Sequence, residues 1–163
     1  VRDPERLFEE TRLGQRMTAG IQAEREELIA RNRKIEAELE AEERELTSLR
    51  AELTPEEFRE KADAFDVKVQ NLRRDSDRRV RDLERSRERA PAIFMQTVEP
   101  VLVELMREAG GVVIMDIRSV LLRAEVIDIT DLAVERVDEE IGDGPDDGAE
   151  DGAAPATDPD TAD

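Results

Sequence analysis

The amino-acid sequence predicts a mostly α-helical protein built around one long antiparallel coiled-coil hairpin. The first observation behind this prediction is a single break, at Thr54 and Pro55, between two stretches of about fifty residues with helical character. Thr54 suits a helix N-cap, Pro55 suits the first helical position, and Glu57 completes a capping box with Thr54. The chain is therefore expected to end one long helix, reverse direction at Thr54 and begin another.

The second observation is a seam in each long stretch, with the alternating spacings of three and four residues that are typical of coiled coils. The first seam consists of Ile21, Arg25, Leu28, Asn32, Ile35, Leu39, Glu42, Leu46, Leu49 and Leu53. The second seam consists of Phe58, Ala62, Phe65, Val69, Leu72, Ser76, Arg79, Leu83, Ser86 and Ala90. Polar residues interrupt both seams, and the second is weakest between Ser76 and Ser86. We therefore expect a loose coil whose packing is thin, or open to water, in that stretch.

The charge distribution supports pairing of the two stretches. Residues 24–60 contain 13 acids and 7 bases, whereas residues 68–89 contain 9 bases and 5 acids. Folding back at Thr54 lays parts of these oppositely charged stretches side by side. Because an exposed ion pair contributes only about 0–1 kcal/mol, the charges favour this register more than they add stability.

Composition limits both the core and the function. Charged residues make up 42% of the chain and aromatic residues 2%, a balance typical of long exposed helices. The net charge is −18, and residues 142–163 carry eight acids and no base, which predicts a disordered acidic tail. The remaining 35 acids and 25 bases argue against binding to nucleic acids or anionic membranes. No apolar run is long enough for an integral membrane segment.

The residue types also argue against catalysis. The chain contains no His, Cys, Trp or Tyr, so it lacks the usual general base, the thiol nucleophile and the common zinc ligands. The acids of residues 143–152 lack the spacing of a calcium loop, and no Lys-Ser/Thr pair follows Gly110-Gly111 as in a phosphate loop. We therefore expect no enzymatic activity, no cofactor and no metal site.

The two ends of the chain are more apolar than the hairpin. Asp3-Pro4-Glu5 is a helix start, and Asp128 precedes a short helix over 132–141. Pro91 and Pro100 lie inside an apolar helical pattern, which predicts a kink or a short break, and Gly110-Gly111 ends this pattern.

Residues 112–115 and 120–122 read as two short apolar strands with a turn at 116–119. Two such strands cannot be buried within one subunit, because an isolated hairpin is marginal in water. We therefore expect other copies of the chain to complete a small β body. The candidate residues of this oligomer body are Phe8, Phe94, Val112, Val113, Ile114, Val120, Leu121 and Leu122.

The order of these elements resembles the Skp (OmpH-like) family of periplasmic chaperones. The resemblance covers roughly residues 3–141. The segments that carry it are Asp3 with Leu7-Phe8-Glu9-Glu10-Thr11-Arg12-Leu13-Gly14, then Gly110-Gly111-Val112-Val113-Ile114-Met115-Asp116, Val120-Leu121-Leu122 and Val126-Ile127-Asp128-Ile129-Thr130.

The resemblance implies a jellyfish-like homotrimer in the periplasm. In such a trimer the β segments form a central body, and three helical arms surround a cavity that holds unfolded outer-membrane proteins without ATP. Residues 1–141 would form the chaperone domain, with the arm at about 20–90, the body at about 1–19 and 91–141, and the acidic tail at 142–163. Only Val1-Arg2 precedes Asp3, so we expect a trimmed start or a misassigned start codon. Well-known members are basic and this chain is acidic, so no lipid site is carried over.

Five residues of the arm are candidate contacts for unfolded clients. Leu53, Phe58 and Phe65 lie near the tip, where the alternative role is to close the distal end of the hairpin. Arg78 and Arg81 belong to the one basic cluster, whose alternative role is a solvated face paired with acids of the opposing helix. The expected function is an ATP-independent holdase, and the alternative is a structural coiled-coil scaffold or adaptor that binds one folded partner.

Overall fold

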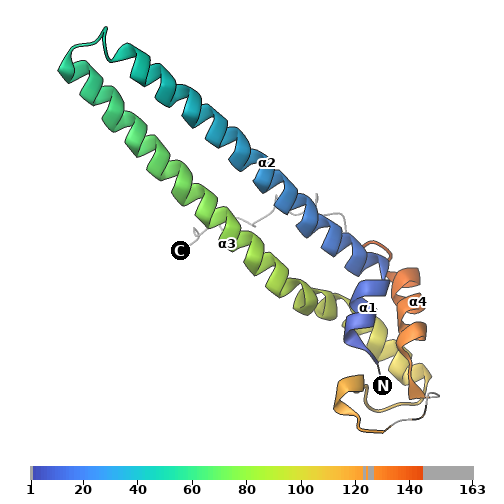
Figure 1. Ribbon diagram of the computed structural model, residues 1–163. Coiled ribbons are helices and arrows are strands. Elements are labelled where there is room, and N and C mark those ends of the chain that lie inside the picture. Colours follow the sequence, from blue (N-terminus) through green and yellow to red (C-terminus); the bar gives the residue numbers. More distant parts are fainter. Residues whose placement is uncertain (1, 123, 125–126, 145–163) are drawn as a thin grey trace, which may run out of the picture.

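The computed structural model describes residues 2–122, 124 and 127–144. Its elements are α1 (Pro4–Glu10), α2 (Arg12–Leu49), α3 (Pro55–Glu108), the 3₁₀ helix η1 (Ile117–Ser119) and α4 (Thr130–Glu140). Helices α2 and α3 run antiparallel as one long arm, and α1, α4 and the end of α3 form a body at its base (Figure 1). This arrangement confirms the predicted mostly helical chain with a long antiparallel hairpin.

The tip of the arm is formed by the capping box that the sequence predicts. The hydroxyl of Thr54 accepts a hydrogen bond from the backbone N–H of Glu57 at 3.3 Å. The Glu57 carboxylate accepts from the backbone N–H of Thr54 at 2.9 Å and from its hydroxyl at 2.8 Å. These donors stabilise the charged carboxylate and lower the pKa of Glu57. The cap therefore fixes the start of α3 directly after the reversal.

Replacing the cap is expected to loosen the tip without affecting the body. The Thr54→Ala substitution removes the hydroxyl that caps α3, so it should cost about 1 kcal/mol. Amide hydrogen exchange should become faster at residues 55–58 and stay unchanged in the body. Thr47→Ala is the matched control, because the Thr47 hydroxyl only donates to the Glu43 carbonyl within α2. Equal exchange at the tip of both variants would contradict a capping role for Thr54.

Near the N-terminus the structure differs from the sequence-based prediction of an uninterrupted helix. Thr11 has an extended backbone, with φ −74° and ψ 149°, and separates α1 from α2. Its buried hydroxyl donates to the Leu7 carbonyl at 2.9 Å and accepts from the Gly14 N–H at 3.3 Å. Thr11 thus closes α1 and caps α2, and Gly14 lets the two helices meet. A Cβ at position 14 would lie 1.7 Å from the Phe8 carbonyl oxygen.

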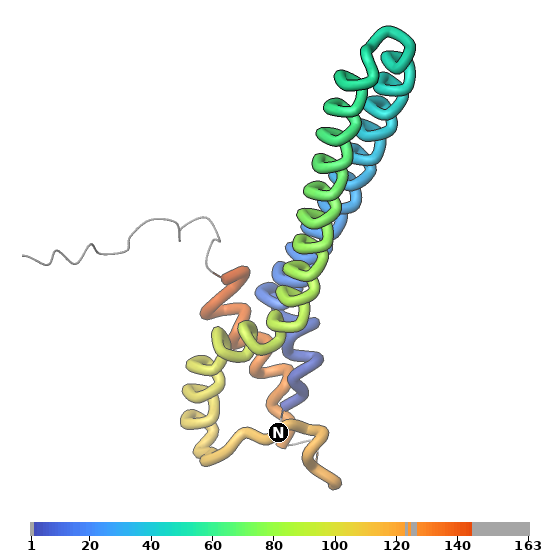
Figure 2. Tube along the Cα trace, turned by 90° about the vertical axis from the view of Figure 1, so that its left-hand side faces the viewer, coloured from blue at the N-terminus to red at the C-terminus, as the bar shows by residue number. Residues whose placement is uncertain are grey.

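The two prolines of α3 bend the helix but do not break it. Both Pro91 and Pro100 lie within α3, which continues to Glu108. The axis of α3 changes direction where the green arm turns into the yellow body segment (Figure 2). The predicted kink is therefore present, and the predicted alternative of a short break is not. Gly110, at φ 64°, ends the helix, and the Gly111 N–H donates to the Met106 carbonyl at 2.9 Å.

The buried core lies entirely in the body. Its center is Phe94, which is 1% exposed and meets the ring of Phe8 edge-on at 5.1 Å between centroids. Buried Thr130 accepts a hydrogen bond from the Asp3 N–H at 2.9 Å, which ties the start of α1 to the start of α4. The other buried apolar residues are Leu7, Leu13, Ala90, Val98, Val101, Leu102, Leu105, Ala133 and Val137.

The two predicted strands are not formed within the single chain. The described residues contain only one isolated parallel bridge, between Arg2 and Asp116. In this bridge the Arg2 N–H donates to the Met115 carbonyl and the Ile117 N–H donates to the Arg2 carbonyl. Strands need neighbouring strands, and among the described residues only Arg2 forms a bridge with this part of the chain. The predicted turn at 116–119 is the short helix η1.

The described chain also extends beyond the predicted start of the acidic tail. Residues 142–144 form turns, in which the Gly142 N–H donates to the Val137 carbonyl. The Arg16 guanidinium donates to the backbone oxygens of Asp143 at 2.9 Å and Gly144 at 3.3 Å. These contacts hold residues 142–144 against α2. The rest of the predicted tail, residues 145–163, lies outside the described residues.

Candidate functional site

The arm has no buried side chain along its length. The seam residues of α2 and α3 are half-buried at best, and no residue from Thr18 to Arg89 is buried. Two of the polar residues that interrupt the seam have partners across it. Asn32 accepts from the Ser76 hydroxyl at 3.0 Å, and Glu42 forms an ion pair with Lys68. The seam is therefore held by register-specific polar pairs and thin apolar contacts, as its sequence indicates.

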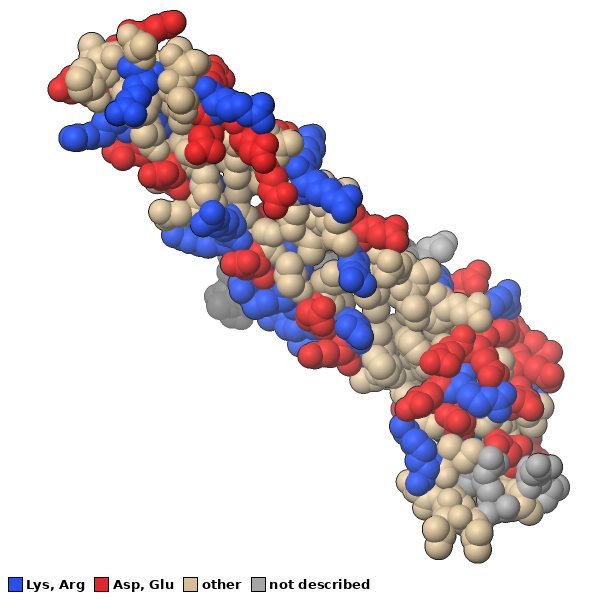
Figure 3. All heavy atoms as spheres, in the orientation of Figure 1, with Lys and Arg blue, Asp and Glu red and all other residues tan. Residues whose placement is uncertain are grey.

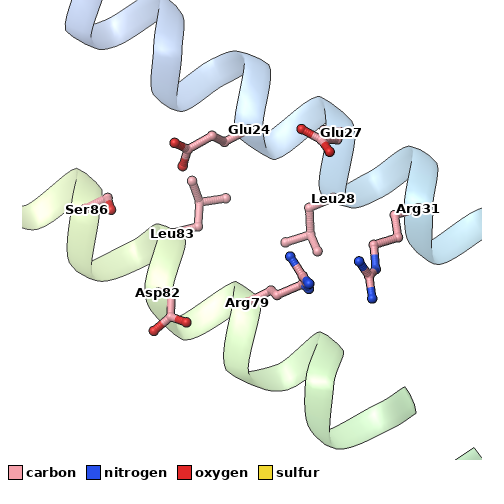
Figure 4. A pocket seen from close by; sticks show the side chains of 8 residues that line it. All are labelled: Glu24, Glu27, Leu28, Arg31, Arg79, Asp82, Leu83 and Ser86. Carbon is pink, nitrogen blue, oxygen red and sulfur yellow. The ribbon is translucent and has the colours of Figure 1, made fainter. Parts of the chain in front are cut away.

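The seam opens toward the base of the arm. A gap of about 230 Å³ separates Leu28 of α2 from Leu83 of α3, with charged residues around it (Figure 4). Two larger grooves of about 650 Å³ and 980 Å³ flank Ile21 and Ala90 farther down. The small side chains of α3 at Ser86 and Ala90 leave this space. The weak stretch of the second seam thus produces the thin, open packing that the sequence predicts.

The three tip candidates face the seam of the hairpin. Leu53, Phe58 and Phe65 are all half-buried. The Arg50 guanidinium lies 5.7 Å from the center of the Phe58 ring, and Phe65 lines a small gap together with Leu49. This placement fits closure of the distal end of the hairpin and leaves only part of each side chain exposed for contact with another chain.

The arginine candidates lie on exposed faces of α3. Arg78 forms an ion pair with Asp75 of the same helix, and exposed Arg81 has no ion pair within the described chain. The predicted partners on the opposing helix are wrong for four arginines of the cluster, because acids three or four residues away on α3 are closer. These arginines are Arg78, Arg79, Arg85 and Arg87. Two ion pairs do cross the arm, Arg31 with Asp75 at 2.7 Å and Lys68 with Glu42.

The structure reveals exposed apolar residues on the arm that sequence reasoning missed. Ile29, Val67 and Val80 are 41%, 58% and 44% exposed. Each is an apolar residue at a helix position outside the seam, and this combination in the sequence is the signal that could have identified them. Charged side chains of both signs lie along the visible face of the arm, and uncharged residues cover much of its base (Figure 3). The arm therefore offers scattered apolar points within a mixed-charge surface.

The base of the body carries the largest apolar exposure. Val112, Val113, Leu121 and Leu122 are 91%, 65%, 96% and 88% exposed. Their segment projects below α1 and α4 (Figure 1). Of the other candidates, Ile114 packs partly against the core and Val120 is half-buried. Phe8 and Phe94 belong to the core of the single chain rather than to this exposed segment.

A charged turn holds this exposed segment in place. The Asp116 carboxylate accepts from the Arg118 side chain at 2.8 Å and from its backbone N–H at 2.9 Å. The Arg118 guanidinium and backbone N–H lower the pKa of Asp116 to about 2. Arg118 also reaches Glu5 at the start of α1, at 2.7 Å. The segment is thus connected to α1 although its apolar side chains are uncovered.

The described residues offer no site for metal chemistry, because no three acids are grouped closely enough to hold an ion. None of the described helices is both long and apolar enough to cross a membrane. What the described part of the chain does present is surface: an open arm and an uncovered apolar base.

Comparison with known proteins identifies the family. The model of the OmpH-like outer membrane protein family matches residues 1–137. The chain belongs to this OmpH-like family. A crystal structure of an OmpH-like candidate outer membrane chaperone from Caulobacter crescentus CB15 has the same fold, with a TM-score of 0.77. It is 18% identical in sequence, and the match covers 86% of this chain and 83% of that one. No curated protein matches the chain.

Proposed function

We propose that this OmpH-like chain is an ATP-independent holdase chaperone of the periplasm. It would bind unfolded outer-membrane proteins between the helical arms of a homotrimer and so prevent their aggregation. The observation that carries this proposal is an arm without any buried side chain, mounted on a body that contains the whole core. An arm of this kind contributes surface rather than stability.

The surface of the arm suits weak binding at many points. Each exposed apolar residue, such as Val67, offers a small contact, and neighbouring charges keep the arm in solution. Several weak contacts on one unfolded chain raise the overall affinity without selecting a sequence. The open seam near Leu28 and Leu83 adds adaptability, because few contacts resist a change in helix spacing. These features favour unfolded clients of varied sequence.

The body supports assembly into an oligomer. Within the described residues the exposed apolar segment at 112–122 has one parallel bridge, at Arg2, so strands of neighbouring copies can pair with it. Three copies would cover Val112, Val113, Leu121 and Leu122 and point the arms in one direction around a cavity. The number three comes from the family resemblance, and no cofactor or nucleotide is needed in this mechanism.

The test is suppression of aggregation. A urea-unfolded outer-membrane barrel protein is diluted into buffer, and light scattering is followed with and without the chain. One trimer per client should suppress scattering without ATP, and unchanged scattering would overturn the proposal. A scaffold or adaptor for one folded partner, the alternative function, also predicts unchanged scattering.

The contacts can be tested by removing apolar points from the arm. The triple variant Ile29→Ser, Val67→Ser and Val80→Ser should weaken client binding roughly tenfold, equivalent to about 1.4 kcal/mol, as measured by fluorescence anisotropy. The matched control replaces three exposed alanines of the same arm, Ala30, Ala37 and Ala41, by serine. If both triple variants bind alike, the exposed apolar residues are not the contacts.

A further inference from the structure

A groove between α2 and α3 at the arm base combines an apolar floor with basic edges. Its volume is about 980 Å³. Three arginines line it, Arg16 from α2 and Arg85 and Arg89 from α3, together with the acids Glu24 and Asp82. Asp82 is already paired with Arg85. The apolar residues that line it are Leu13, Met17, Ala19, Gly20, Ile21, Ala23, Ala90 and Ile93.

The basic edge on α3 continues up the arm. Arginines at 74, 78, 81, 85 and 89 are spaced by four, three, four and four residues. This spacing places them on one face of the helix, which we call the arginine stripe. Each arginine of the stripe has one acid as a direct neighbour in the sequence, and these acids are Asp75, Asp77, Asp82, Glu84 and Glu88. The stripe lies within residues 68–89, where 9 bases outnumber 5 acids, whereas the whole chain has 25 bases and 43 acids.

The described chain ends against residues that line this groove. Arg16 donates to the backbone oxygens of Asp143 and Gly144. A Cβ on Gly144 would lie 2.6 Å from a methyl group of Leu13. The residues that follow, 145–163, include seven acids and no base. The acidic segment therefore starts at the rim of the groove.

We propose that residues 145–163 bind in the groove and along the arginine stripe of their own chain. Reach permits this contact, because six extended residues span up to about 20 Å and packed helix axes are about 8–10 Å apart. Charge also favours this contact. The acids of residues 145–163 would lie beside Arg81, Arg85 and Arg89, whereas most other surfaces of the chain carry more acids than bases. The segment thereby competes with acidic stretches of clients for Arg78 and Arg81. The competition, unlike the binding itself, rests on the proposed function.

Engineered disulfides test the position of the segment directly, since the natural chain has no cysteine. Ala149→Cys is combined either with Ala23→Cys, which lines this groove, or with Gln22→Cys, which lines the neighbouring groove of about 650 Å³ instead. The two arm positions are adjacent in α2. The Ala23 pair is expected to form an intrachain disulfide about tenfold faster, because binding raises the local concentration of the segment.

The controls identify the cause of any preference. Arg85→Gln with Arg89→Gln, or 0.5 M salt, should remove the difference in rate, because both weaken the charge attraction. Equal rates for the two cysteine pairs in low salt would overturn the proposal. A dimer band on a non-reducing gel, showing disulfides between chains, would overturn it as well and assign the groove to the segment of another copy.

Client binding tests the competition separately. Deleting residues 145–163 should tighten binding of an acidic unfolded client about threefold to tenfold at low salt, and this gain should vanish at 0.5 M salt. If the groove disulfide forms but the deletion leaves affinity unchanged, the competition is wrong. If no unfolded client binds either form while the disulfide forms, the proposed function fails and the binding of the segment stands.

Discussion

The Val113→Asp and Leu121→Asp double variant is expected to be a monomer. Both side chains are more than 60% exposed in the single chain, so the substitutions place charge where the isolated subunit already meets water. In the proposed trimer the same positions are covered, and an unpaired buried charge costs roughly 3–5 kcal/mol. Sedimentation velocity at micromolar concentration should show a trimer for the natural chain and a monomer for the variant.

The matched control for this variant is Val67→Asp. Val67 is 58% exposed, close to the 65% of Val113, but it lies on the arm rather than at the base. This control should assemble like the natural chain. Circular dichroism of the double variant should keep the helical signal, because its core at Phe94 is untouched. A double variant that still assembles would place the oligomer contact elsewhere, and a dissociated Val67→Asp protein would assign it to the arm.

The hairpin could be predicted from the sequence because its signals are local. The capping box at Thr54 involves residues three apart, and the seams follow helix periodicity. The hydrogen bond between Asn32 and Ser76 across the seam is consistent with the position of the reversal, because the reversal determines which residues of α2 and α3 face each other. Each of these features depends either on residues close together in the sequence or on the alignment of α2 with α3 that the reversal fixes.

The body was harder to predict because its contacts join distant segments. Residues 112–115 have strand-forming composition, but a strand forms only when a neighbouring strand is present, and the described part of the chain offers only the bridge at Arg2. The arginine partners were misassigned because acids on the same helix, such as Asp82, lie closer than acids across the arm. The seam periodicity does not predict the exposed residues Ile29 and Val80, because both lie outside the seam positions.

The break at Thr11 shows how one signal can be read in two ways. Thr11 and Gly14 are recognisable as a motif of the family, yet spacing alone does not separate this motif from a continuous helix. The role of this motif depends on a tertiary contact between α1 and α2. Thr11 caps α2, and Gly14 admits the end of α1 so that Leu7 and Phe8 reach the core. The glycine is therefore required by a contact that only the folded body contains.

Gly14→Ala is expected to destabilise the body severely. The new Cβ would lie 1.7 Å from the Phe8 carbonyl oxygen and 2.7 Å from its carbon, distances that only a movement of the α1 backbone can relieve. Overpacking of this kind costs typically 1–3 kcal/mol. Movement of α1 also pulls Leu7 from the core, where it is fully buried. The free energy of unfolding, measured by urea titration at fixed protein concentration, should fall by roughly 3 kcal/mol.

Gly20→Ala is the matched control and should change stability in the opposite direction. Gly20 lies in the same helix, six residues later, and a Cβ there meets nothing within 4 Å. Alanine should therefore stabilise α2 by roughly 0.5–1 kcal/mol, because glycine loses more backbone entropy in a helix. The opposite signs separate the clash at Phe8 from any general effect of alanine in α2. If Gly14→Ala were as stable as Gly20→Ala, the contact between α1 and α2 could not be the reason for glycine at position 14.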